Sequence, residues 1–106
     1  MIWRVRDRAT FVALSRAPRV RRGPIMVRRV PSDDGTTRVA YAIGRTVGSA
    51  VVRNRIRRRV RAVVAARGDD LAPGAYLIGA RREVLTMPFA ELDRVVDDAL
   101  TAAAAR

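Results

Sequence analysis

Several residue types that carry chemistry are absent from this chain of 106 residues. It has no cysteine, which excludes disulfide bonds and thiolate metal sites. It has no histidine, which removes the commonest general base and the usual zinc ligand. An active site built on either of these side chains is therefore excluded.

Long apolar runs are absent as well. No stretch approaches the ~20 apolar residues of a membrane-spanning helix. The opening sequence, MIWRVRDRATF, lacks the apolar segment of a signal peptide. We expect a cytoplasmic protein that does not bind membranes. The length fits one domain over residues 1–106, and the hydrophobic content of 49% is typical of a globular chain.

Lysine is also missing, so all 22 basic residues are arginine. They outnumber the 10 acidic residues and leave a formal net charge of +12, with an isoelectric point near 11.8. Such an excess of positive charge indicates a polyanionic partner. Arginine suits that role because its planar guanidinium pairs with phosphate and stacks on bases.

Two capping residues and one proline mark the starts of three helices. Asp7 is placed to cap a helix over residues 8–16, and Ser49 to cap a helix over residues 50–66 that a glycine ends. Pro88 opens a third helix, in which apolar residues recur at helical spacing to the chain end.

Strands are predicted in three segments, residues 25–30, 37–43 and 75–80. The turn sequence PSDDGT links the first two, which we expect to pair as an antiparallel hairpin. Residues 1–7 and 102–106 are expected to be frayed, with Trp3 covering the edge of the core. The pattern predicts an α+β fold, a small α/β sandwich with one central sheet of about four strands and three helices, in the order α-β-β-β-α-β-α.

The stretch VRNRIRRRVRAVV, residues 52–64, contains the densest charge in the chain. Six of the nine residues from Arg53 to Arg61 are arginine, and no acid occurs between Asp34 and Asp69. At about 100° per residue on a helix, its apolar side chains form one stripe that can dock on a sheet. The stripe consists of Val52, Ile56, Val60, Val63 and Val64.

Arginines flank this apolar stripe on both sides. Arg53, Arg57 and Arg61 follow one edge at intervals of four residues, about 6 Å apart along the helix axis, which is close to the spacing of neighbouring phosphates. Arg55 and Arg59 lie against the other edge. Like charges one turn apart destabilise a helix, and a face that serves only solubility mixes both signs. The helix is therefore predicted to bind a negatively charged ligand.

Charge alone does not identify the polyanion. A helix that binds a membrane surface exposes large apolar side chains, whereas this one offers mainly valines. The spacings of helix-turn-helix, zinc-finger and basic-zipper proteins are missing. RNA, which proteins recognise largely by shape and backbone, is favoured. A ribosomal-type RNA-binding protein without an enzymatic partner and a DNA-binding architectural protein remain alternatives.

The sequence VGSAVVRNRIRRRVRA, residues 47–62, resembles the signature of the bacterial ribonuclease P protein component. In that family, Val-Gly-x-Ala-Val precedes Arg-Asn-Arg and a basic helix. The segments RATF, RVAYAIGR, AYLIGARR and PFAELDRVVDDAL are similar to the family's first helix, two strands and closing helix, so the resemblance covers about residues 8–100. It implies a left-handed crossover between parallel strands around the basic helix, a rare arrangement.

The resemblance also implies a function, that of the protein subunit of the endonuclease ribonuclease P. This subunit would bind the catalytic RNA and precursor tRNA and assist removal of the tRNA 5′ leader. Magnesium ions held in the RNA would cut the bond. The resemblance therefore implies no catalytic residue, no metal and no cofactor bound by the protein itself, and DNA is not an expected partner.

Site residues carry over by matching position. The resemblance implies that the basic helix and the turn before it contact the catalytic RNA, through Arg45, Arg53, Asn54, Arg55, Arg57, Arg58 and Arg61. The family's leader cleft lies between the first helix and the sheet, where our candidates are Phe11, Ser15, Met26 and Arg28. Phe11 would stack a base there, or would instead pack in the core.

The chain departs from the family pattern in this cleft. Members often carry a second aromatic where this chain has Ser15, and aromatics on the first long strand, where it has Met26 and Arg28. Thr46 occupies a position that is usually basic. Leader binding is therefore expected to depend more on charge and less on stacking, with Arg28 or Arg29 as the substitute.

Overall fold

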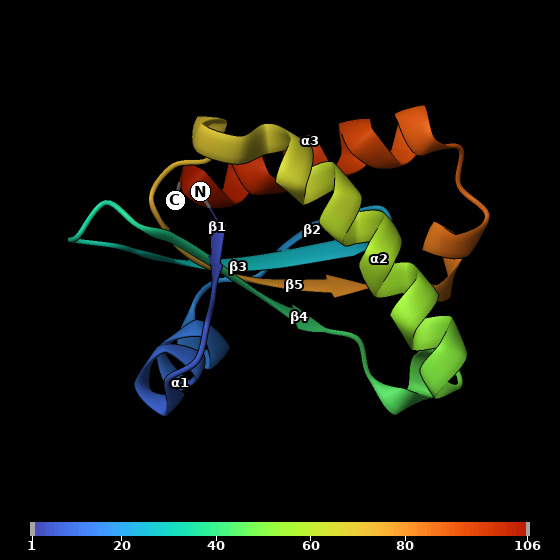
Figure 1. Ribbon diagram of the computed structural model, residues 1–106, viewed down its shortest axis with the longest axis horizontal. Helices are drawn as coiled ribbons and strands as arrows, with labels where there is room; N and C mark the ends of the chain where they lie inside the picture. Colours follow the sequence, from blue (N-terminus) through green and yellow to red (C-terminus); the bar gives the residue numbers. More distant parts are fainter. Residues whose placement is uncertain (1, 106) are drawn as a thin grey trace.

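The structure, a computed structural model, describes residues 2–105, apart from the side chain of Asp69, as one mixed sheet with helices on both faces. Helices α2 (Ala50–Arg67) and α3 (Phe89–Ala104) cover one face, and α1 (Arg8–Arg16) lies on the other (Figure 1). The strands are β1 (Ile2–Arg4), β2 (Val20–Arg22), β3 (Ile25–Pro31), β4 (Thr37–Ala42) and β5 (Gly74–Ala80). Short 3-10 helices are η1 (Arg45–Val47), η2 (Gly68–Asp70) and η3 (Arg82–Leu85).

The α+β class and the three helices agree with the prediction, but the sheet has five strands rather than about four. Both ends of the chain are also better ordered than expected. Ile2–Arg4 pairs in parallel with β4, and α3 continues to Ala104 with Ala103 buried. Fraying was predicted for residues 1–7 and 102–106, but β1 occupies residues 2–4 and α3 extends over residues 102–104, while residues 1 and 106 lie outside the described part of the chain.

The predicted antiparallel hairpin between residues 25–30 and 37–43 is wrong. The sheet order is β1-β4-β5-β3-β2, so β5 lies between β3 and β4. It pairs antiparallel with β3 and parallel with β4. All of its residues except Leu77 are buried, which suits a central strand covered on both faces. Strand β4, helix α2 and strand β5 thus form a crossover between adjacent parallel strands.

The predicted helix caps are confirmed. Asp7 Oδ2 accepts a hydrogen bond from the backbone N–H of Thr10 at 2.9 Å, and Ser49 Oγ accepts one from Val52 N–H at 3.3 Å. Each bond satisfies a donor that the first turn of a helix leaves free. They fix where α1 and the basic helix α2 begin.

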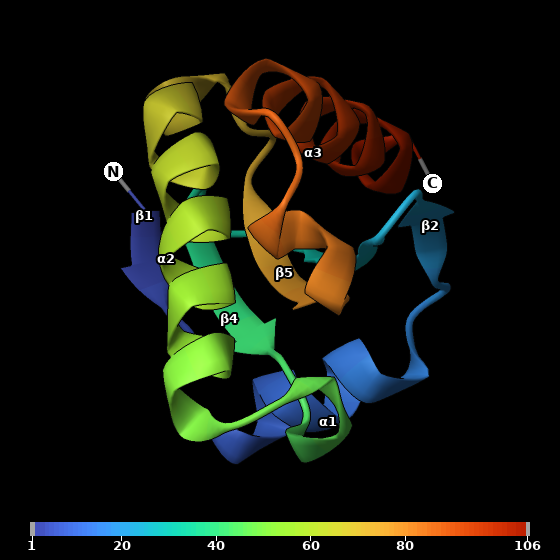
Figure 2. The ribbon, with the colours of Figure 1, turned by 90° about the vertical axis from the view of Figure 1, so that its right-hand side faces the viewer.

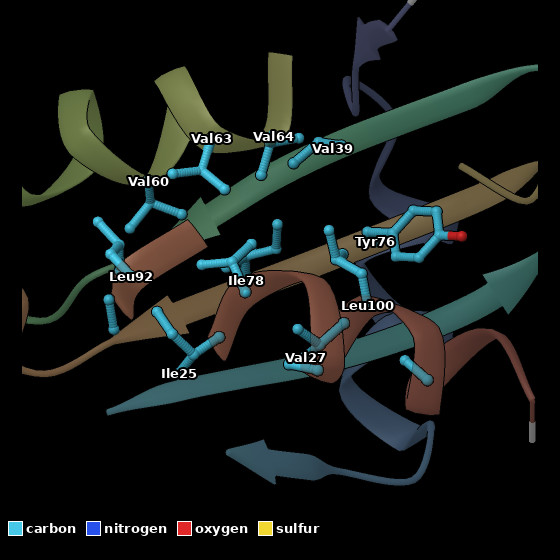
Figure 3. Packing of buried hydrophobic residues seen from close by; sticks show 14 of the residues in the cluster. Ile25, Val27, Val39, Val60, Val63, Val64, Tyr76, Ile78, Leu92 and Leu100 are labelled. Atoms are coloured by element: carbon cyan, nitrogen blue, oxygen red, sulfur yellow. The ribbon is translucent and has the colours of Figure 1, made fainter. Parts of the chain in front are cut away.

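The main core lies between the sheet and helices α2 and α3 (Figure 3). The apolar stripe of α2 reaches it as predicted, with four of its residues buried, namely Ile56, Val60, Val63 and Val64. On the other face, Leu14 of α1 packs with Val5 and Ala75 in a much smaller cluster. Helix α2 is therefore held by one side, and the rest of its surface is left for other contacts.

Candidate nucleic-acid interface

Helix α2 presents one edge toward β4 and the opposite edge toward η3 and α3. Figure 2 shows it running past β1 and β4, with η1 at its N-terminal end. Arg61 lies on the first edge, with its guanidinium carbon 5.6 Å from the centre of the Tyr41 ring on β4. Arg59 lies on the second edge, next to η3. The helix places these arginines in different surroundings although they are two residues apart.

The edge toward β4 carries the predicted row of Arg53, Arg57 and Arg61. The first two are half-buried and the third is exposed. Arg57 Nη1 donates a long hydrogen bond of 3.4 Å to Asn54 Oδ1. Among residues 2–105, Asp69 excepted, no acid forms an ion pair with an arginine of this row. Its positive charge is therefore available to an external anion.

Asn54, Arg55 and Arg58 complete the predicted set on α2. All three are exposed on the outer surface of the helix. In the described part of the chain, neither of these two arginines pairs with an acid. All the predicted RNA-binding residues of α2 are thus exposed or half-buried, outside the apolar stripe that packs on the core.

The arginines on the edge toward α3 bond to the protein itself. Arg59 donates to the carbonyl oxygens of Val84 and Met87, the second at 2.8 Å, and so ties α2 to the segment between β5 and α3. At the end of α2, Arg67 Nη2 pairs with Asp93 Oδ1 at 3.0 Å. Its Nε lies 3.2 Å from Asp97 Oδ1 without the geometry of a hydrogen bond. Arg59 and Arg67 therefore stabilise the packing of α2 against α3 and the segment that precedes it.

Arg45 lies on η1, exposed at the N-terminal end of α2. This segment is held from η3, because Arg82 Nη1 donates to the carbonyl oxygen of Val47 at 3.3 Å. Gly48 allows the close approach. A Cβ atom there would lie 2.8 Å from Val52 Cγ1 and 3.2 Å from Arg82 Nη1. The glycine of the Val-Gly-x-Ala motif thus keeps Arg45 next to the basic helix.

The four predicted cleft residues share one face of the sheet but do not meet at one point. Arg28 Nη1 donates to the carbonyl oxygens of Ser15 and Ala17, at 3.0 and 2.8 Å, and so closes the C-terminal end of α1. Met26 is half-buried on the same strand. Arg29 faces the opposite side, where its guanidinium carbon lies 5.8 Å from the Tyr76 ring centre. Of the two arginines, Arg28 is therefore the one on the α1 side.

Phe11 lies apart from the other three, in a groove of about 470 Å³ at the edge of the sheet. It is 41% exposed, so it is not a core residue. The other walls come from β1, β4 and α2, with Trp3, Tyr41 and Arg61 among them. Burial raises the pKa of the Tyr41 phenol above its ordinary value, and the nearby Arg61 opposes that shift. Tyr41 therefore stays neutral at physiological pH.

Comparison with known proteins now identifies the family. The family model described as Ribonuclease P matches residues 2–104. The chain belongs to the ribonuclease P protein family. The ribonuclease P protein component of Brucella suis is 34% identical, over 95% of this chain and 79% of the relative. That of Bartonella quintana is 40% identical, over 81% of this chain and 71% of the relative.

Solved structures of ribonuclease P proteins share the fold. The protein from Staphylococcus aureus matches with a TM-score of 0.81 and 18% identity, over 95% of this chain and 94% of that one. The protein from Thermotoga maritima matches with a TM-score of 0.82 and 18% identity, over 93% and 96% of the two chains. The arrangement of one sheet and three helices is therefore that of ribonuclease P proteins.

Sequence reasoning missed several residues that shape this ribonuclease P protein surface. Arg59 and Arg82 act through carbonyl groups far away in the sequence, which no local pattern reveals. Trp3 was expected to cover the core edge, but it is 55% exposed and lines the groove. In the sequence Trp3 lies between Ile2 and Arg4, and a strand of three residues is too short to show a periodicity that would have located it.

In the described part of the chain, every helix is too short or too polar to span a membrane. Among the described side chains, no three acidic, histidine or cysteine residues gather in a group that could hold a metal ion.

Proposed function

We propose that this chain is the subunit of ribonuclease P that binds the catalytic RNA and precursor tRNA and assists removal of the 5′ leader. Family membership supports the subunit role. In the proposal, Mg²⁺ held by the RNA supplies the chemistry, and the protein contributes binding and positioning.

The arginines of α2 support the proposal independently of family membership. The arginines on the β4 edge of α2 and on its outer surface have no acidic partner among the described side chains, whereas Arg59 and Arg67 on the opposite edge bond to the protein. A row of guanidinium groups spaced by one helical turn, about 5.4 Å, suits consecutive phosphates of a folded RNA. Arg45, held beside the start of the helix, extends the same surface.

Single-turnover cleavage of a precursor tRNA by a bacterial ribonuclease P RNA at low magnesium tests this function. We expect cleavage at the mature 5′ end to appear only when the protein is added, because its charge replaces part of the magnesium that screens the two RNAs. Tight RNA binding without any effect on cleavage would instead make the chain a general RNA-binding protein.

A further inference from the structure

The guanidinium of Arg61, the last arginine of the row on α2, lies over an aromatic ring of the sheet. Its central carbon is 5.6 Å from the centre of the Tyr41 ring on β4. That distance is within the ~6 Å over which the face of an aromatic ring attracts a cation. In the described part of the chain, the one other contact of this kind joins Arg29 to Tyr76, away from the row. Arg61 is thus held in a way that the first two arginines of the row are not.

The sheet fixes the position of the Tyr41 ring. Tyr41 pairs with Ile78 of the central strand β5, and its half-buried side chain packs against the main core. Side chains of a strand alternate between the two faces, so Tyr41 lies on the same face as Val39, a member of the core between the sheet and α2. A side chain on a strand is held more precisely than one on a loop. The ring therefore offers Arg61 a rigid surface.

An aromatic ring holds a guanidinium without occupying its hydrogen-bond donors. The contact uses the flat face of the guanidinium, whereas the N–H groups lie in its plane and point outward from the edge. Arg59 behaves differently, because it donates its N–H groups to the carbonyl oxygens of Val84 and Met87. No acid among the described side chains pairs with Arg61. Its contact with Tyr41 therefore leaves it able to donate two parallel hydrogen bonds to a phosphate.

A side chain that is held before binding loses less freedom when it binds. Immobilising one long side chain at an interface lowers the affinity by about 2- to 13-fold. Arg58, exposed on the outer surface of α2, has no aromatic ring beside it among the described residues and bears this loss in full. Arg61 has already given up part of its freedom in the free protein. The ring thus makes Arg61 a better phosphate ligand than its charge alone would.

We propose that Tyr41 is a positioning residue for RNA binding, which holds Arg61 along the β4 edge of α2 with its N–H groups free for a phosphate. The proposal rests on the proposed function and deepens it, because it adds a residue of the sheet to the basic helix. Tyr41 acts through Arg61 and needs no contact of its own with RNA. Its ring carries the effect rather than its hydroxyl group, since the cation is attracted to the π face.

Filter binding to a bacterial ribonuclease P RNA separates the role of the ring from that of its volume. Tyr41→Leu removes the π face but keeps an apolar side chain, and we expect it to lower the affinity by about 2- to 13-fold. Tyr41→Phe keeps the ring and should bind within about twofold of the unmodified protein. The slope of log affinity against log salt should not change in Tyr41→Leu, because Arg61 keeps its charge. Arg61→Ala should lower that slope by about 0.7–0.9.

A double-mutant cycle shows whether Tyr41 acts through Arg61. In the Arg61→Ala background, we expect Tyr41→Leu to cause no further loss of RNA affinity, since the side chain that it positions is missing. Losses that add up would overturn the proposal, because Tyr41 would then affect RNA binding by another route. An unchanged affinity of Tyr41→Leu in the unmodified background would overturn it as well.

Nitrogen-15 relaxation of the arginine Nε–H groups in the free protein measures the positioning itself, without RNA. We expect the order parameter of Arg61 to exceed that of Arg58. Tyr41→Leu should lower the Arg61 value to that of Arg58, and Tyr41→Phe should preserve it. If the Arg61 order parameter were the same in Tyr41→Leu and in the unmodified protein, Tyr41 would not hold this side chain and the proposal would fail.

Tyr76→Phe is the matched control for a general loss of stability. Tyr76 is the other tyrosine of the chain and also faces an arginine, but its hydroxyl donates to the carbonyl oxygen of Ala72 at 2.6 Å. Loss of this bond should lower the free energy of unfolding, measured in urea, and leave the RNA affinity unchanged. If Tyr76→Phe weakened RNA binding as much as Tyr41→Leu does, the effect of Tyr41 would be structural and the proposal would fail.

Stimulation of precursor tRNA cleavage, measured in parallel, tests the proposed function separately. If the unmodified protein stimulates cleavage while Tyr41→Leu binds RNA normally, only the role of Tyr41 is lost. RNA binding without stimulation would contradict the proposed function alone, since Tyr41 acts on binding. Absence of RNA binding by the unmodified protein would overturn both proposals.

Discussion

The two edges of helix α2 use the same residue type for opposite purposes. On the edge toward α3, Arg59 and Arg67 bond to carbonyl and carboxylate groups of the protein. On the edge toward β4, Arg57 and Arg61 have no acidic partner in the described chain. The difference shows that the number of arginines in a helix does not measure how much positive charge it leaves for an external partner. What matters is which acceptors the fold places opposite each guanidinium.

The largest effect on stability is expected from Arg59→Ala. Loss of a charged donor leaves the carbonyls of Val84 and Met87 without their partner, at a cost of about 2–3 kcal/mol. Urea unfolding measures this change. Arg58→Ala, at the exposed neighbouring position, is the control and should change the free energy of unfolding by less than about 0.5 kcal/mol. Equal losses in the free energy of unfolding for both variants would contradict the distinction between the two edges of α2.

The double variant Arg57→Ala with Arg61→Ala should keep the stability of the protein but change its binding to RNA. Stability should stay within about 0.5 kcal/mol, while the slope of log affinity against log salt for the catalytic RNA falls by about 1.4–1.8, the value for two lost phosphate contacts. Filter binding over a series of salt concentrations measures the slope. An unchanged slope would show that neither arginine contacts a phosphate of the RNA.

A smaller loss is expected at the end of the helix from Arg67→Ala. The Arg67 side chain is 19% exposed and its partners Asp93 and Asp97 are 43% and 57% exposed, so water screens the pairs. Exposed pairs of this kind contribute about 1 kcal/mol or less. A double-mutant cycle with Asp93→Ala isolates the coupling between the two side chains. A coupling of zero would show that the Asp93 carboxylate does not contribute, which leaves Asp97 and the Asp93 carbonyl oxygen as the partners of Arg67.

The smallest effect concerns an acid on the loop between β3 and β4, far from α2. Hydrogen bonds from Ser32 and Thr36 hold the pKa of Asp34 well below its ordinary value of 3.8. Because the folded-state pKa is depressed, the stabilisation is present above pH 3.8 and is lost as the pH falls below it. Asp34→Asn should therefore flatten the acid side of the stability profile. Urea unfolding at pH 7 and pH 3 compares the two proteins, and parallel profiles would contradict the assignment.

The sequence predicts the local features of this fold, but it does not predict which strands pair with each other. Asp7 and Ser49 were recognised as caps because a cap acts within three residues of itself. The hairpin prediction failed because strand pairing is decided between distant segments, and β5 competes for the central position with its uniformly apolar sequence. The three-residue strand β1 is too short for any periodicity to show.

In the candidate site too, the sequence predicts local geometry but not contacts between distant segments. The helical repeat correctly placed Arg53, Arg57 and Arg61 on one edge, since that geometry is local. It also placed Arg59 at the other edge but could not show the carbonyl groups opposite it. The exposure of Phe11 has no local signal in the sequence, because the residues around it come from β1, β4 and α2.

The central position of β5 has a consequence for the order of events during synthesis of the chain. Strands β1 to β4 leave the ribosome before the strand that joins β3 to β4, which is complete only at residue 80 of 106. Until then the nascent sheet has two unpaired inner edges, and the basic helix has no complete surface on which to dock. The unfolded arginine-rich segment is thus exposed to ribosomal RNA, the nearest polyanion, before the protein has acquired its fold.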